Sequence, residues 1–231
     1  MSKSPRAIRS LADVRPGDLM FTNIGGFIPG VFPVKLGQLV LGERVRLGPL
    51  SIDHVGVVTA AQIPGRHARV NDAHPRLVQA MPHGAEEISL TTEKYWESSV
   101  AFARLPEDYP GQAEDAAAIA RLFVTEKIPY SFLSYAALAA WRAGLKAERL
   151  ERWIDRRGPA IPFPAWTPTV PVGANIHLPA EAICSVLADQ AWSLAGKRVM
   201  EGVAHQAVTP GALALRCWND GDVQWGGAGL L

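Results

Sequence analysis

Cysteine is scarce in this chain, which has two cysteines among its 231 residues. Two cysteines cannot form the disulfide framework on which small secreted domains depend, so a reducing interior is the default expectation. The sequence also contains no CxxC and no HExxH motif. It therefore gives no support for a zinc site, and we expect no bound metal.

A charge excess and a long hydrophobic run are missing as well. The formal net charge is +1, which gives no general case for nucleic acid as a partner. No run of about 18 apolar residues is present, so we expect no integral membrane segment. The first residues, MSKSPRAIRSLADVRPGD, lack the apolar core of a signal peptide. We therefore expect a cytoplasmic protein, or one released without a signal peptide, as a phage-encoded protein would be.

The composition is that of a globular protein. Hydrophobic residues make up 48% and charged residues 19% of the chain, which is enough apolar material for a packed core. We expect a single domain over residues 1–231, since no clean boundary is visible. It carries a charged helix and a Pro-rich insertion at about 145–179. A turn-rich C-terminal tail follows from about residue 197.

Strand patterns occupy the first half of the chain. A Pro-Gly-Asp turn precedes a strand that begins at Leu19. The segment SIDHVGVVTAAQ is apolar, β-branched and short, which is the strongest strand signal. Further strand patterns are RLVQAMPHG, AEEISLTT and VAFARLP. Short connections between them predict an antiparallel meander of four to six strands.

Helical periodicity begins at Gly111. GQAEDAAAIARLFVTEK is an amphipathic pattern, and helices are also predicted over 128–144, over 145–157 and in EAICSVLADQAW, the last ending near Gly196. The Pro-rich segment over 158–179 is expected to lack regular structure. Strands first and helices after predict an α+β fold, with an antiparallel sheet and helices packed on one face.

Cys184 lies at the first turn of the helix in EAICSVLADQAW. A helix N-terminus stabilises a thiolate, so this position suits a nucleophile. The spacing places Cys184 on the apolar face that packs on the sheet. It turns Ser185, Asp189 and Ser193 largely toward solvent. The alternative is ordinary packing, because free cysteine is among the most buried residue types. We assign packing to Cys217, which has no helix start before it.

The sequence has six histidines that could serve as a base for that thiol. Of these, only His54 falls inside a predicted strand. A polar ring in an apolar strand needs partners, so His54 is either a satisfied structural histidine or a base. Gln79 interrupts the next strand in the same way. Its amide could orient the His54 ring if the two strands are neighbours, or it could face water from an edge strand.

The order of these motifs resembles a known family. PGDLMF, HVGVV, VQAMPHG, PYSFLSY and ICSVLADQAW follow one another as in the circularly permuted branch of the NlpC-like papain-fold superfamily. That branch includes YiiX/YebB-like cysteine hydrolases and lecithin:retinol acyltransferase-like enzymes. The resemblance covers roughly residues 16–195 and places the histidine strand before the cysteine helix, the reverse of ordinary NlpC-type enzymes.

The resemblance implies a role for five positions. Cys184 would be the nucleophile, His54 the general base and Gln79 the residue that orients His54. Tyr130, in PYSF, would line the substrate pocket. Asp18 matches a turn position with a structural role.

Gln79 is a departure from that pattern, because related permuted sequences often have Glu at this position. An amide can orient the ring but cannot stabilise an imidazolium by charge. Glu86 or Glu87 would replace that charge only if the next strand brought one of them close.

The function implied is a cysteine hydrolase of the amidase or peptidase type, which acts through a thioester acyl-enzyme without a cofactor. The resemblance suggests a peptide or amide bond of cell-wall type as the substrate, such as a linkage in peptidoglycan. One alternative is a thiol acyltransferase or lipid-ester hydrolase that uses the same thioester. Another is a catalytically weak or inactive binding module on the same fold.

Overall fold

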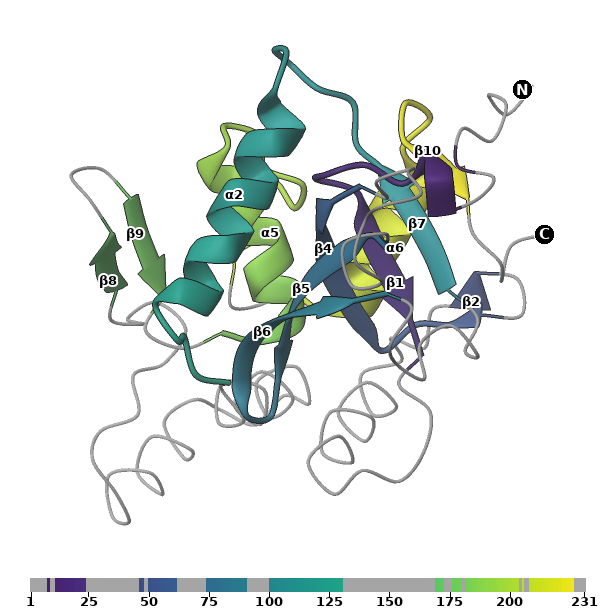
Figure 1. The fold of residues 1–231 in the computed structure, drawn as a ribbon. Coiled ribbons are helices and arrows are strands. Elements are labelled where there is room, and N and C mark those ends of the chain that lie inside the picture. Colours follow the sequence, from purple (N-terminus) through teal and green to yellow (C-terminus); the bar gives the residue numbers. More distant parts are fainter. Residues whose placement is uncertain are drawn as a thin grey trace, which may run out of the picture.

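The computed structural model describes residues 8, 11–23, 46–47, 50–61, 74–90, 100–130, 169–172, 176–179, 182–203, 205 and 208–226. Their fold is α+β, as predicted. A six-stranded antiparallel sheet, ordered β10-β7-β1-β4-β5-β6, carries three α-helices among the described residues (Figure 1).

The strands of the sheet are short. The predicted positions of five of them are confirmed, whereas the sixth lies in the tail that was predicted to be turn-rich. The strands are β1 (Leu19–Thr22), β4 (His54–Ala60), β5 (Arg76–Met81), β6 (Gly84–Ser89), β7 (Val100–Arg104) and β10 (Gln224–Gly226). Strands β4, β5 and β6 follow one another as a meander, but the predicted continuation of this meander into β7 is wrong. Strand β7 pairs with β1 instead. All four residues of β1 are buried, and an apolar strand of that kind is most stable between two neighbours.

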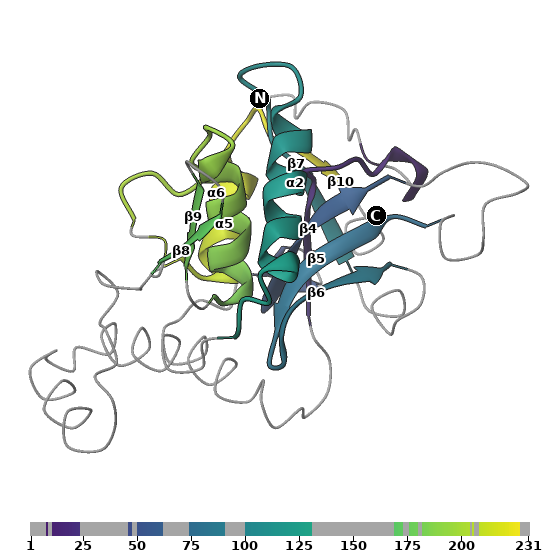
Figure 2. The ribbon, with the colours of Figure 1, turned by 60° about the vertical axis from the view of Figure 1, so that its left-hand side comes forward.

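Three helices cover one face of this sheet (Figure 2). They are α2 (Gln112–Thr125), α5 (Cys184–Leu194) and α6 (Pro210–Asn219). In α2 the predicted apolar face is buried and includes Ala116, Ile119, Ala120 and Phe123. No helix in the described part of the chain is long and apolar enough to cross a membrane.

The core therefore has two parts. Residues such as Phe21, Val55 and Val57 pack against the helices on one face. Met20 and Leu77 lie in a smaller cluster on the other face. Alternation along the strands explains this division, because successive side chains point to opposite faces of a sheet.

The tail predicted to be turn-rich instead completes the core. Helix α6 begins after Thr209, whose side-chain oxygen accepts a hydrogen bond from the Ala212 N–H at 3.2 Å. Pro210 occupies the first helical position, where its missing N–H costs nothing. After α6, Trp225 of β10 stacks on Phe21 with ring centroids 5.6 Å apart.

The Pro-rich segment was also expected to be irregular, and this expectation is wrong for its last part. Strands β8 (Thr169–Val172) and β9 (Ile176–Pro179) form a two-stranded antiparallel sheet. Both strands of such a sheet are edges, so prolines that cannot donate a hydrogen bond are tolerated. A second two-stranded antiparallel sheet pairs β2 (Arg46–Leu47) with β3 (Leu50–Ser51). The helices predicted over 128–144 and 145–157 lie almost entirely outside the described residues.

Two residues near the ends of the described chain meet beside β7. Ile8 forms a parallel backbone bridge with Gly226. A Cβ atom at position 226 would lie 1.7 Å from the Ile8 carbonyl oxygen, so only glycine permits this approach.

Candidate active site

His54 and Gln79 are joined by a buried hydrogen bond. His54 begins β4, and its Nε2 lies 2.8 Å from Oε1 of Gln79 on the neighbouring strand β5. The two residues are 2% and 0% exposed. The alternative in which Gln79 faces water from an edge strand is therefore wrong, because β5 lies between β4 and β6.

The ladder between β4 and β5 covers only part of β4. Strand β5 pairs with β6 along its whole length, from Arg76 to Met81. Its pairing with β4 runs only from Val57 to Ala60, so the first residues of β4 lie outside this ladder. Gly56, two residues after His54, is closely packed. A Cβ there would lie 2.9 Å from the Val78 carbonyl oxygen, so glycine is favoured at this position.

Cys184 is the first residue of α5 and lies against the start of β4. The preceding residue, Ile183, is extended and supplies no side-chain cap. Backbone N–H groups of Val55 and Ser185 are hydrogen-bonded to the Cys184 sulfur. Since Val55 directly follows His54, the structure brings the predicted nucleophile to the strand that carries the predicted base.

Burial determines the protonation of the Cys184 thiol and of the His54 imidazole. Burial raises the pKa of the Cys184 thiol to about 12, although the Val55 and Ser185 N–H groups act in the opposite direction. Burial lowers the pKa of His54 to about 4, against the Gln79 hydrogen bond and the negative charge of Glu86. The resting pair is therefore a neutral thiol and a neutral imidazole at neutral pH.

Tyr130 lies beside the segment that leads into α5. It forms a parallel backbone bridge with Ala182, and the Ala182 N–H donates to the Pro129 carbonyl at 3.0 Å. Ala182 precedes Cys184 by two residues. The structure thus brings the backbone of Tyr130 close to the start of the cysteine helix.

The other face of α5 was predicted to be exposed, but Ser185 and Asp189 are fully buried and Ser193 is half-buried. Ser185 Oγ donates to the Val208 carbonyl at 2.7 Å. Asp189 accepts from the Met200 N–H at 3.1 Å and pairs with His205 Nδ1 at 2.6 Å. Helical spacing alone missed this burial because the chain after α5 folds back over that face.

Asp18 has the structural role expected of it. Its carboxylate accepts from Nε and Nη2 of Arg104 at 2.8 and 2.7 Å. It also accepts from the Arg15 N–H at 2.8 Å. This network ties the turn before β1 to the end of β7.

Glu86 is the site residue that the sequence interpretation discounted. It lies on β6 opposite Gln79, and its Oε1 accepts from Gln79 Nε2 at 2.9 Å. Counting the hairpin would have revealed this contact, because a two-residue turn at Pro82 and His83 pairs positions 79 and 86. Glu87 points to the opposite face and binds Thr59 Oγ1.

The described residues contain no group of three histidine, cysteine or acidic side chains placed to hold a metal ion. Comparison of the chain with protein-family models, with curated proteins and with solved structures gave no match in any of the three.

Proposed function

We propose that this protein is a cysteine hydrolase of the amidase or peptidase type, built on a papain-like fold of the permuted NlpC kind. The observation that carries the proposal is the buried 2.8 Å contact between His54 Nε2 and Gln79 Oε1. This contact orients the His54 ring. The next residue, Val55, directs its N–H at the Cys184 sulfur. This is the thiol, base and orienting group that thiol hydrolysis requires.

In the proposed reaction, Nδ1 of His54 takes the thiol proton as the Cys184 sulfur attacks a carbonyl carbon. The imidazolium then protonates the leaving amine as the C–N bond breaks, which leaves a thioester on Cys184. His54 next activates a water molecule, which hydrolyses the thioester and restores the thiol. Because both groups are neutral at rest, proton transfer accompanies the attack instead of preceding it.

The start of α5 supplies the stabilisation that the tetrahedral intermediate needs. Ile183 provides no side-chain cap, so the N–H groups of the first turn are not satisfied by a capping side chain. The N–H groups of Cys184 and Ser185 are directed at the sulfur and lie next to the position of a developing oxyanion. Such donors and the positive end of the helix dipole stabilise negative charge.

The proposed substrate is a peptide or amide of cell-wall type, such as peptidoglycan, and Tyr130 is proposed to contact it. The family resemblance supports this substrate class. The bridge between Tyr130 and Ala182 supports the position of Tyr130 near the site.

One observation favours a second candidate, a weak or inactive binding module on the same fold. The Cys184 thiol is buried and has a pKa of about 12. Unless His54 accepts its proton, such a thiol is almost entirely protonated at neutral pH and is a poor nucleophile.

Alkylation by iodoacetamide tests the two candidates, with Cys217 as a reference inside the same chain. Cys217 is equally buried, and its pKa is also about 12. Without assistance, each thiol should react about 10³-fold more slowly than free cysteine at pH 7, because its thiolate fraction is that much smaller. For a hydrolase we expect Cys184 to react at least about 100-fold faster than Cys217.

The variant His54→Ala should remove that difference while the protein remains folded. Peptide mass spectrometry measures both cysteines in one sample. Equal labelling of the two cysteines in the unmodified protein would refute the hydrolase and support the binding module. Product analysis with short cell-wall peptides and with acyl glycerols then identifies the bond that is attacked.

A further inference from the structure

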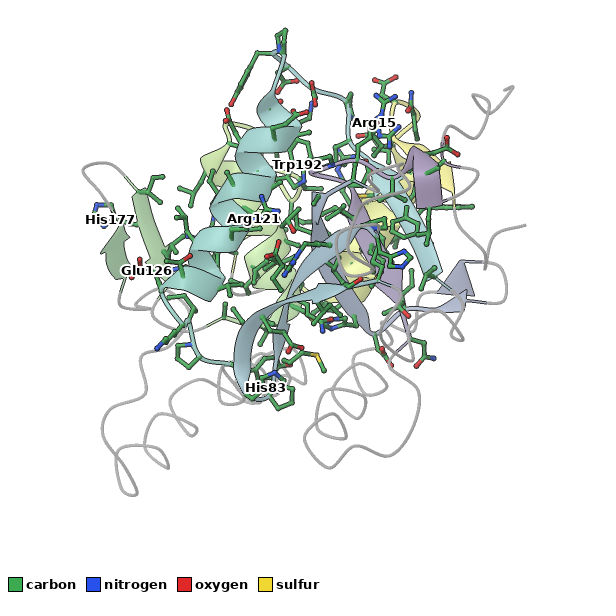
Figure 3. The ribbon with its side chains drawn as sticks, in the orientation of Figure 1. Arg15, His83, Arg121, Glu126, His177 and Trp192 are labelled. Carbon is green, nitrogen blue, oxygen red and sulfur yellow. The ribbon has the colours of Figure 1, made fainter. Side chains whose placement is uncertain are left out.

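A chain of hydrogen-bonded side chains leads from the candidate base to the surface. It begins with the His54–Gln79 contact at 2.8 Å and continues from Gln79 Nε2 to Glu86 Oε1 at 2.9 Å. Glu86 Oε2 lies 2.8 Å from His83 Nε2. The His83 side chain is 66% exposed and lies at the tip of the β5–β6 hairpin (Figure 3).

The Glu86 carboxylate determines which atom donates and which accepts in each of these side-chain hydrogen bonds. An ionised carboxylate only accepts hydrogen bonds, so the Gln79 amide must turn its nitrogen toward Glu86. Its oxygen then faces His54 Nε2, and an amide oxygen also only accepts. The neutral His54 ring must therefore carry its single proton on Nε2, which leaves the lone pair on Nδ1.

We propose that Glu86 is a positioning residue that fixes the tautomer of His54 through Gln79. Its catalytic consequence rests on the proposed function, because only the tautomer with the proton on Nε2 lets Nδ1 receive the Cys184 proton. Its structural part, the control of the tautomer, does not depend on any reaction.

An amide alone does not specify a direction, and Glu86 supplies one. The oxygen and nitrogen ends of Gln79 have nearly the same shape. A flipped amide would present N–H groups to His54 and move the ring proton to Nδ1. With Glu86 in place, that flip would set an amide oxygen against a carboxylate oxygen. Glu86 also supplies the negative charge that Gln79 lacks, and this charge favours an imidazolium at His54.

Glu87 provides a matched control on the same strand. It carries the same charge but pairs with Val78, so its side chain points to the face of the sheet opposite to that of Gln79. Its carboxylate binds Arg121 Nε at 2.9 Å and Arg76 Nη2 at 3.3 Å, and Figure 3 shows Arg121 on α2. A variant at Glu87 therefore removes a charge from β6 without touching Gln79.

The experiment is a nitrogen NMR measurement of the imidazole of His54 in the full chain, labelled at histidine. The unmodified protein should show the proton on Nε2. In Glu86→Gln, the ratio of Nε2–H to Nδ1–H tautomers should fall about tenfold, because a charge-assisted hydrogen bond is roughly twice as strong as a neutral one. Glu86→Leu should give a similar fall, and Glu87→Gln none.

The double variant Gln79→Glu with Glu86→Gln tests the mechanism by rescue. It exchanges the two groups, so a carboxylate now accepts directly from His54 Nε2 and the tautomer should return. The inference is overturned if Glu86→Gln and Glu86→Leu both keep the tautomer of the unmodified protein. It is also overturned if Glu87→Gln changes the tautomer as much as they do.

Alkylation of Cys184 separates this inference from the proposed function. If the tautomer shifts in Glu86→Gln while Cys184 never reacts faster than Cys217, the positioning role stands and the hydrolase does not. If Cys184 is reactive and the tautomer does not depend on Glu86, the hydrolase stands and the positioning role is refuted. If both hold, Glu86→Gln should slow alkylation of Cys184 about tenfold.

Discussion

The two cysteines of this chain share almost every simple property and differ in their surroundings. Cys184 and Cys217 are 2% and 1% exposed, both lie in helices packed on the same core, and burial raises both pKa values to about 12. The comparison shows that neither burial nor acidity identifies a candidate nucleophile here. What distinguishes the two sites is which groups lie around each sulfur.

At Cys184 the surrounding groups are backbone donors and the charge of Asp53. The sulfur meets the Val55 and Ser185 N–H groups at the start of a helix, one residue from His54. Cys217 lies in the second half of α6, and its carbonyl accepts from Trp225 Nε1 at 3.1 Å. The charges near its thiol belong to Arg216, Asp220 and Asp189. Cys217 therefore remains a packing residue.

The largest expected difference between the cysteines is in acyl transfer. With the activated ester p-nitrophenyl acetate, Cys184→Ser should lower formation of an acetyl-enzyme about 10³-fold or more, as is typical for loss of a nucleophile. Cys217→Ser should change it less than about twofold. Intact mass spectrometry measures the adduct. An equal loss in both variants would remove the distinction drawn here.

Acid pH should reveal the buried His54, which directly precedes the Val55 whose N–H meets the Cys184 sulfur. The pKa of His54 is about 4 in the folded protein and about 6.5 when unfolded, so the unfolded chain binds more protons between these values. Folding stability should therefore fall by about 3 kcal/mol as the pH drops from about 6.5 to about 4. Urea unfolding measures this loss, and His54→Asn should abolish it. A variant that loses as much stability as the unmodified protein would contradict the burial of a neutral ring.

Alkaline pH should show what the two cysteines have in common. Both thiols have pKa values near 12 when folded and ordinary values when unfolded, so the folded protein binds more protons above about pH 9. Stability should fall with rising pH, by about 2 kcal/mol per cysteine between about pH 9 and pH 10.5. Cys184→Ala and Cys217→Ala should each remove a similar part of this slope. A slope that depends on Cys217 alone would show that the Cys184 thiol ionises readily when folded.

The smallest expected effect concerns the starts of the two helices. Thr209 caps α6 through Ala212 N–H, whereas Ile183 gives α5 no side-chain cap. Thr209→Ala should destabilise the protein by about 1 kcal/mol without changing alkylation of Cys184. Thermal unfolding measures the loss. A change in Cys184 labelling would mean that α6 and the candidate site are coupled.

Much of the candidate site is predictable from the sequence, because His54 and Gln79 each interrupt an apolar strand and adjacent strands commonly pair. Helix α6 is not predicted, because Pro210 and Gly211 are typical of turns. Its formation depends on the Thr209 cap and on burial of Leu213 against the distant sheet. Tertiary packing of this kind outweighs local residue preference.

The contacts made by acidic residues were the hardest to predict. Glu86 and Glu87 are neighbours in sequence, and the register of the β5–β6 hairpin alone decides which of them faces Gln79. Asp189 lies on a helix face that only the later chain covers, through Met200 and His205. Local periodicity does not contain this information, since both contacts depend on how separate segments meet.

The bridge between Ile8 and Gly226 makes the backbone nearly a closed ring. In such a ring, the position of the chain ends decides the order of the segments along the sequence. It does not change which segments are neighbours in space. A linker between the present ends and a new cut in the connection between β7 and α2 would place Cys184 ahead of His54. The order of these two residues in the sequence is therefore not required for them to be neighbours in space.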